Sequence, residues 1–155
     1  MKFRNPLLVV SDMERSLAFY RSMLGLRVTA DFGANKTLTG GICLQTAESW
    51  PTLIGEAGSR LSYGGNDAEL YFETEDLDAF LAKLEGMADV AYVHPVVEHR
   101  WGQRAVRIYD PDRHIIEVGE SLRAPMLRFA AQGMTHAEIA KRMDVPLALV
   151  EKLMQ

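Results

Sequence analysis

Residues 5–26 of the chain, NPLLVVSDMERSLAFYRSMLGL, decide the fold that the sequence predicts. Leu7–Val10 is a short apolar run of β-favouring residues, which predicts a strand. Asp12 follows as the expected helix N-cap, because its carboxylate can accept hydrogen bonds from the unpaired amide groups of the first turn. Gly25 is expected to end the helix, since glycine readily adopts positive φ. The apolar residues between them recur at helical spacing, and this stripe consists of Met13, Leu17, Tyr20 and Leu24.

A second stretch repeats this pattern, with Asp76 standing 64 residues after the first N-cap. Residues 69–86, ELYFETEDLDAFLAKLEG, again combine a strand, an aspartate N-cap, a helical apolar stripe and a glycine. Each helix is followed by a late apolar strand with a polar residue inside it, at residues 41–48 (GICLQTAE) and 114–120 (HIIEVGE). An internal repeat of this length indicates two similar structural modules.

The repeat predicts an α+β protein made of two paired β-α-β-β-β modules and a C-terminal helical extension. Its expected parts are a first module at residues 3–46, a connector at 47–67, a second module at 68–121 and the extension at 122–155. Asp110–Arg113 (DPDR) is predicted to be a tight turn, because Asp and Pro supply turn chemistry. The strands after the helices are expected at 26–32, 37–39 and 42–46, and at 90–94, 96–99, 103–109 and 115–119.

The composition is that of an ordinary globular protein. Of the 155 residues, 48% are hydrophobic and 25% are charged, and the net charge of −4 is spread along the chain, which is not typical of a nucleic-acid-binding surface. The single cysteine, Cys43, excludes an internal disulfide and is typical of a reducing compartment. No apolar run approaches the roughly 20 residues that cross a bilayer, and no signal-peptide-like segment opens the chain. We therefore expect a cytoplasmic protein without a membrane partner.

The C-terminal extension predicts three short helices. One is expected at residues 124–132, a capping box at Thr135–Glu138 opens the second, and Pro146 suits the first position of the third. Residues 133–146 resemble the helix-turn-helix of resolvase-type DNA-binding segments, but acidic residues offset much of the positive charge, and we expect no nucleic-acid partner. Residues expected to dock on the body or on a partner subunit are Ile139, Met143 and Val150. Apolar residues expected to be left over for a homodimer interface are Met126, Phe129, Val150, Leu153 and Met154.

Strand alternation predicts a polar site. Successive strand residues point to opposite faces, so four polar side chains at matching places in the repeat face away from the helices. They are Asn5, Gln45, Glu69 and Glu117. The two glutamates interrupt apolar strands, and inward-facing charges are seldom tolerated without a role. Arg104 and Arg107 have opposite strand parity, so one of them could join this face as an anion clamp, and the sequence leaves open which one.

The paired modules resemble the vicinal oxygen chelate superfamily, also called the glyoxalase/bleomycin-resistance/dioxygenase family. The resemblance covers residues 3–121 and is carried by residues 10–20 (VSDMERSLAFY), 24–26 (LGL) and 109–117 (YDPDRHIIE). It implies that the two sheets curl into a cup-shaped sheet around one cavity, and that the protein is a homodimer. In the metal-binding relatives, the positions of Asn5, Gln45, Glu69 and Glu117 are ligand positions, usually filled by His or Gln, Glu, His and Glu.

This sequence departs from that ligand pattern, because none of the four positions is a histidine. An extradiol dioxygenase needs two histidines and a carboxylate for iron, so that activity is disfavoured. The resemblance then implies Glu69, Glu117 and Gln45 as the metal ligands. Such an all-oxygen set favours magnesium, manganese or calcium over zinc or nickel, and a protein without a metal is the alternative.

The resemblance favours two functional hypotheses, and the C-terminal extension suggests a third. The first is a metal-assisted lyase or isomerase in an acidic cup, with Glu117 and Glu69 as catalytic carboxylates that move a proton next to a carbonyl of a small oxygenated substrate. The second is a non-catalytic binder of a cationic ligand, like the bleomycin-resistance proteins; a sensor whose C-terminal extension contacts DNA is a third. Unless a cation neutralises the acidic pair, repulsion and burial should raise the pKa of one carboxyl. The predicted ligand-binding residues are Asn5, Tyr71, Phe32, Trp50, Trp101 and His99.

Overall fold

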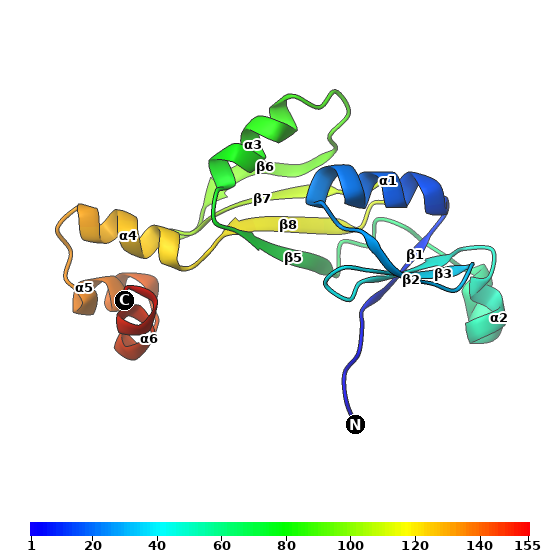
Figure 1. Cartoon of the computed structure of the whole chain (residues 1–155), viewed down its shortest axis with the longest axis horizontal. Helices are drawn as coiled ribbons and strands as arrows, with labels where there is room; N and C mark the ends of the chain where they lie inside the picture. Colours follow the sequence, from blue (N-terminus) through cyan, green and yellow to red (C-terminus); the bar gives the residue numbers. More distant parts are fainter. The chain divides into compact units, whose positions relative to one another are not determined.

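The computed structural model describes residues 1–155 and divides into two units (Figure 1). Unit 1 comprises residues 1–66 and 110–114, and unit 2 comprises residues 67–109 and 115–155. Each unit holds one four-stranded sheet, with the strand order β1-β4-β3-β2 in unit 1 and β5-β8-β7-β6 in unit 2. In both sheets the first strand pairs in parallel with the fourth, and the remaining pairs are antiparallel. The repeated topology confirms the predicted pair of β-α-β-β-β modules.

Unit 1 follows the predicted element order closely. Its elements are β1 (Leu7–Val10), α1 (Met13–Leu24), β2 (Val28–Asp31), β3 (Asn35–Leu38), β4 (Cys43–Thr46), α2 (Trp50–Ile54) and the 3-10 helix η1 (Gly55–Ser59). The Asp12 side chain accepts from the backbone N–H of Arg15, and Gly25 ends α1 with a φ of 71°, as predicted. The buried side of α1 is rotated slightly from the predicted stripe, because Ser16 and Met23 are buried where leucines were expected.

The reason for this rotation is a buried polar turn at Asp110–His114, which belongs to unit 1. The Asp112 carboxylate accepts from the backbone N–H of Ser11 at 3.1 Å and from the Arg15 guanidinium at 3.0 Å, and it lies 3.5 Å from the hydroxyl of Ser16. The small serine therefore faces the turn, where a leucine would place an apolar side chain against the buried carboxylate. The predicted tight turn is confirmed, and it is anchored to the first turns of α1.

Tyr20 is the second anchor of this turn, and its replacement is expected to destabilise unit 1. Its hydroxyl donates to the buried Asp110 carboxylate at 2.9 Å. Tyr20→Phe should lower the free energy of unfolding by about 1.5–3 kcal/mol, the usual range for a hydrogen bond to a charged group. Urea denaturation measures this loss against Tyr92→Phe, which changes an exposed tyrosine. Equal midpoints for the two variants would show that the bond contributes nothing to stability.

Unit 2 contains the remaining elements: β5 (Glu69–Thr74), α3 (Leu77–Glu85), β6 (Tyr92–Glu98), β7 (Arg104–Tyr109), β8 (Ile115–Glu120), α4 (Arg123–Ala131), α5 (His136–Met143) and α6 (Leu147–Leu153). The two strands predicted at 90–94 and 96–99 are wrong as separate elements, because β6 runs through Pro95. This proline has no N–H to donate, but β6 is an edge strand, and its register against β7 shifts on both sides of His94. The edge position explains why a proline does not end the strand.

The two faces of the unit 2 sheet differ in character. Helix α3 lies along one face (Figure 1), and Arg104 of β7 donates to Asp78 of α3 from that side. The alternate residues of the sheet, which include Arg107, therefore point to the opposite face. We call this opposite face the far face; its members include Glu69, Tyr71, Arg107 and Glu117.

The three C-terminal helices form a hydrophobic cluster of their own, together with Trp101 and Leu122. The capping box at Thr135 and Glu138 is confirmed. Ile139, Met143 and Val150 are buried as predicted, but they pack within the cluster of the extension itself, with Trp101 packed against it from the β6–β7 loop. Pro146 is the N-cap of α6 and not its first residue.

The prediction that five apolar residues of the extension remain free for a dimer interface is wrong for three of them. Met126, Phe129 and Val150 are buried inside the cluster, and only Leu153 and Met154 stay partly exposed. Homodimerisation stays a prediction, but the three buried residues no longer support it.

None of the helices is long and apolar enough to cross a membrane.

Candidate functional site

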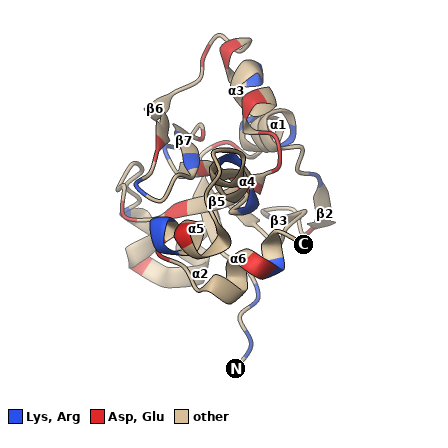
Figure 2. Ribbon diagram, turned by 90° about the vertical axis from the view of Figure 1, so that its left-hand side faces the viewer, with Lys and Arg blue, Asp and Glu red and all other residues tan.

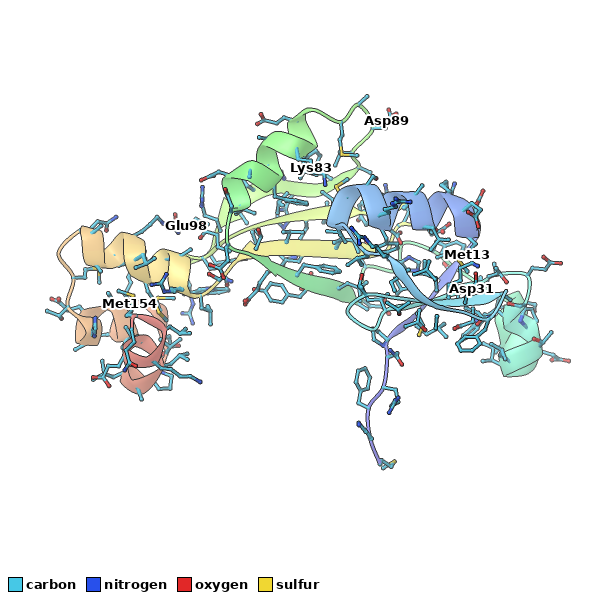
Figure 3. The ribbon with its side chains drawn as sticks, in the orientation of Figure 1. Met13, Asp31, Lys83, Asp89, Glu98 and Met154 are labelled. Carbon is cyan, nitrogen blue, oxygen red and sulfur yellow. The ribbon has the colours of Figure 1, made fainter.

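The candidate site is built on the far face of the unit 2 sheet, where three adjacent strands meet. Glu117 of β8 lies in register with Tyr71 of β5 on one side and with Arg107 of β7 on the other. Glu69 precedes Tyr71 by two residues and therefore shares its face. Strand register alone thus brings the two predicted catalytic carboxylates next to one arginine. Figure 3 draws the side chains of this sheet, with Glu98 labelled at the end of β6.

Arg107 lies between the two carboxylates. Its Nε donates to Glu69 at 2.8 Å, its Nη2 contacts a Glu117 carboxylate oxygen, and its Nη1 lies 3.3 Å from Nε2 of His94. The arginine side chain is 22% exposed, compared with 37% for Glu69 and 9% for Glu117. The positive charge beside the acidic pair is therefore supplied by the chain itself, through the Arg107 guanidinium.

This geometry pushes the pKa values of the two carboxyls in opposite directions. Hydrogen bonding to Arg107 lowers the pKa of Glu69, whereas burial raises the pKa of Glu117. The hydrogen bond to Glu69 also raises the pKa of Arg107, so the guanidinium stays charged. Two carboxyls with separated pKa values are a common arrangement in acid–base catalysis, where one holds a proton and the other stays ionised.

A chain of aromatic and amide side chains adjoins this cluster. The Tyr71 hydroxyl donates to Glu73 and accepts from the Gln103 amide, both at 3.0 Å, and burial with this carboxylate contact raises the pKa of Tyr71 to about 12. Trp101 donates from its indole nitrogen to the Gln103 amide oxygen at 3.0 Å and stacks on His99 with ring centroids 4.4 Å apart. Burial, with a smaller effect from the charge of Arg107, lowers the pKa of His99, which favours a neutral imidazole.

Gly119 makes room for this chain. A Cβ added at Gly119 would lie 3.2 Å from the Tyr71 ring and 3.5 Å from the Gln103 amide nitrogen. The absent side chain therefore lets the tyrosine ring and the amide approach strand β8, where the Tyr71 hydroxyl lies between Gln103 and Glu73.

The predicted site residues divide between the two units. Unit 2 brings together five of them: Glu69, Tyr71, His99, Trp101 and Glu117. In unit 1 the Gln45 amide bonds to the side chains of Asn35 and Ser49, Asn5 donates to the carbonyl of Gly41, Phe32 is exposed, and Trp50 is half-buried in α2. A role for Asn5, Phe32, Gln45 and Trp50 in the site stays a prediction.

The sequence left the choice between Arg104 and Arg107 open, and the structure decides it. Arg104 bonds Asp78 and Glu120 on the α3 side, and Arg107 takes the place beside Glu117. The predicted turn at Asp110–Arg113 carried a usable signal, because counting outward from it along a hairpin pairs residue 107 with residue 117. His94 and Gln103 were missed, and His94 left no such signal because the register of β6 is irregular around it.

The fit of a divalent ion depends on the donors that the chain brings together. No three His, Cys, Asp or Glu side chains gather in a way that could hold a metal ion. Both glutamates of the far face direct oxygens at the Arg107 guanidinium, and an ion bound there would have to displace it. This donor set therefore does not fit a divalent ion in the arrangement described. Magnesium, manganese or calcium binding stays a prediction, and no chemical step below depends on it.

Two β-α-β-β-β repeats, with carboxylates on a sheet face turned away from the helix, define a protein of the glyoxalase class. Residues 3–123 match the family model of the glyoxalase-like domain. The chain therefore belongs to this family and to the vicinal oxygen chelate superfamily. No curated protein sequence matches it.

Several solved structures are similar to this chain. A protein of unknown function from Agrobacterium tumefaciens str. C58 is 41% identical with a TM-score of 0.70, over 79% of this chain and 95% of that one. A glyoxalase/bleomycin resistance protein/dioxygenase from Nocardioides is 18% identical with a TM-score of 0.65, over 79% and 84% of the two chains. A lactoylglutathione lyase from Agrobacterium tumefaciens is 21% identical with a TM-score of 0.59, over 77% and 93%. The last two likenesses concern the fold alone.

Proposed function

We propose that the protein is a glyoxalase-like lyase or isomerase that moves a proton next to a carbonyl group of a small oxygenated substrate. The observation that carries this proposal is the Arg107 guanidinium shared by the two carboxylates, with Glu117 buried next to this fixed positive charge. Burial raises the pKa of Glu117 although Arg107 opposes the rise. In this proposal Glu117 is the general base, and Arg107 binds the substrate oxygen. Glu69 is a positioning residue that holds the guanidinium through two hydrogen bonds.

The proton transfer and the ion pair are coupled in this mechanism. When Glu117 takes the proton from carbon, the C–H electron pair moves into the carbonyl group and leaves an enolate oxygen. The protonated Glu117 is then a neutral partner of Arg107, and the guanidinium can pair with the new oxyanion in its place. The number of anions around Arg107 stays constant, which lowers the cost of developing charge at a site with little water. In a substrate with a hydroxyl group on the deprotonated carbon, transfer of the hydroxyl proton to the enolate oxygen and return of the first proton from Glu117 to the former carbonyl carbon complete an isomerisation. In a substrate with a leaving group β to the carbonyl, the enolate re-forms the carbonyl and the leaving group departs with its bonding electron pair, which completes a lyase reaction.

The experiment is exchange of carbon-bound hydrogen for deuterium in D₂O, followed by ¹H NMR. Suitable probes are hydroxyacetone, dihydroxyacetone and the hemithioacetal of methylglyoxal and glutathione, the last because a lactoylglutathione lyase shares the fold. The wild-type protein should accelerate exchange of at least one probe, and Glu117→Gln should abolish the acceleration. Glu85→Gln, at the exposed end of α3, is the matched control and should exchange like wild type. No acceleration with any probe would count against the proposal.

A cationic-ligand binder is the second candidate, and the surroundings of Glu69 favour it. This carboxylate is 37% exposed, and the aromatic rings of Tyr71 and of the stacked His99 and Trp101 lie on the same unit. Carboxylates next to aromatic faces bind organic cations. Calorimetric titration with bleomycin separates the two candidates: a binder should lose affinity in Glu69→Gln and keep it in Glu117→Gln, whereas the proposed enzyme should show no such preference.

A further inference from the structure

A cleft of about 580 Å³ lies in unit 2 between the β6–β7 loop and the end of α5, and Trp101 is the one residue that it shares with the candidate site. Its volume lies within the range of small-molecule sites. Its principal lining residues are Arg100, Trp101, Leu122, Lys141, Arg142 and Val145. The wall formed by α5 lies beyond residue 123, where the match to the glyoxalase-like domain ends. The C-terminal extension therefore adds this cleft to the family fold.

The polar side of the cleft is positive. Arg100, Lys141 and Arg142 line it against one acidic residue, Asp144, in a chain whose net charge is −4. Figure 2 shows the basic part of α5. The ion pair between Arg100 and Asp144 is 3.7 Å long and highly exposed at both ends, so it neutralises little of this charge. Lys141 and Arg142 form no ion pair, which leaves two cations for an external anion.

Arg142 is held in place without being neutralised. Its Nη1 donates to the backbone carbonyl of Arg100 at 2.6 Å, and its guanidinium lies 5.4 Å from the centroid of the Phe129 ring. Both contacts fix the side chain and leave its charge unpaired. A cation that is already ordered loses little entropy when it binds an anion.

The other side of the cleft is apolar. Leu122, Val145 and Trp101 are partly buried there and pack against the hydrophobic cluster of the three C-terminal helices. A ligand that matches both sides carries an anionic head and an apolar body. We infer that the cleft binds an organic anion of this kind, with a carboxylate or phosphate group facing Lys141 and Arg142 and the apolar body against Trp101.

The Trp101 indole gives a direct readout of this binding. In a Trp50→Phe background it is the only indole of the chain, and its N–H signal is resolved by ¹H–¹⁵N NMR. Titration with octanoate and with octyl phosphate should shift this signal in a saturable manner, and these two probes distinguish a carboxylate from a phosphate head. Inorganic phosphate should bind at least tenfold more weakly, because it has no apolar body.

The matched variants are Lys141→Glu and Lys152→Glu, which make the same charge change at two exposed positions of the extension. Lys141→Glu should weaken binding of both amphiphilic anions about tenfold or more, and Lys152→Glu should leave it unchanged. Equal affinities in the two variants, or no saturable shift, would overturn the inference. So would tight binding of a short DNA duplex that is lost in Lys141→Glu, because the cations would then serve nucleic acid. Binding is measured without turnover, so failure of this inference leaves the proposed enzyme activity untouched.

Discussion

Arg107→Met is expected to lower the free energy of unfolding by about 3 kcal/mol at pH 8, at the lower end of the range for breaking a buried ion pair. The reason is that Glu117, with a side chain only 9% exposed, would keep its negative charge beside Glu69 without a cation. The loss is placed at the lower end because Glu69 is partly exposed and water can screen it. Urea denaturation of the purified variant measures the effect, and Arg27→Met, on an exposed residue, is the matched control.

The pH dependence of this loss follows from the pKa of Glu117. Burial raises this pKa in the folded protein, and removing Arg107 takes away the interaction that opposes the rise. A carboxyl with a raised folded-state pKa binds a proton more readily in the folded state than in the unfolded state, so its stability cost is present at high pH and disappears as the pH falls through the folded pKa. The deficit of Arg107→Met should therefore shrink between pH 8 and pH 5.

A double variant isolates the interaction. Arg107→Met combined with Glu117→Gln removes both charges and should recover most of the stability that the single variant loses. The double variant should also lose the pH dependence of the deficit. If the single variant were equally destabilised at pH 5 and pH 8, and the second substitution recovered nothing, the loss would come from packing of the arginine stem and not from charge.

Glu117→Gln is expected to lower the rate of proton exchange by about 10²–10⁴-fold, the usual contribution of a general base. Glutamine has the same shape and can still accept a hydrogen bond from Arg107, so the variant should fold like wild type. The wild-type rate should rise with pH as Glu117 becomes ionised, with a midpoint above that of an ordinary glutamate because burial raises its pKa. Glu69→Gln should cost less, since Glu69 acts through the position of Arg107. A Glu117→Gln rate equal to that of Glu85→Gln would remove Glu117 from the reaction.

The parts of the fold that the sequence predicted correctly are those with local signals. Asp12 and Gly25 bound α1 because capping depends on a few neighbouring residues, and the 64-residue echo of this pattern at Asp76 identified the second module. Strand parity likewise placed Glu69 and Glu117 on one face, because side-chain alternation is a property of each strand alone.

The errors arise where the outcome depends on distant residues. Two separate strands were predicted on either side of Pro95, but β6 is an edge strand and tolerates the proline. The edge position depends on the strand order of the whole sheet, which no local signal gives. Met126 and Phe129 were expected to be free for a partner, but α5 and α6 fold back on them. Arg107 could be selected only by pairing β7 with β8 across the turn, and the contact of His94 with it depends on an irregular register.

Burial of Glu117 and the hydrogen bond of Glu69 to Arg107 divide the acidic pair into a proton-accepting Glu117 and an ionised Glu69. ¹³C NMR titration of the glutamate side-chain carboxyls, assigned with Glu69→Gln and Glu117→Gln, tests this division without knowledge of the substrate. We expect one far-face carboxyl that titrates above the ordinary glutamate range and is lost in Glu117→Gln, and a second that titrates below this range and is lost in Glu69→Gln. Two carboxyls that titrate together within the ordinary range, or a higher pKa at Glu69 than at Glu117, would show that the pair is not divided in this way.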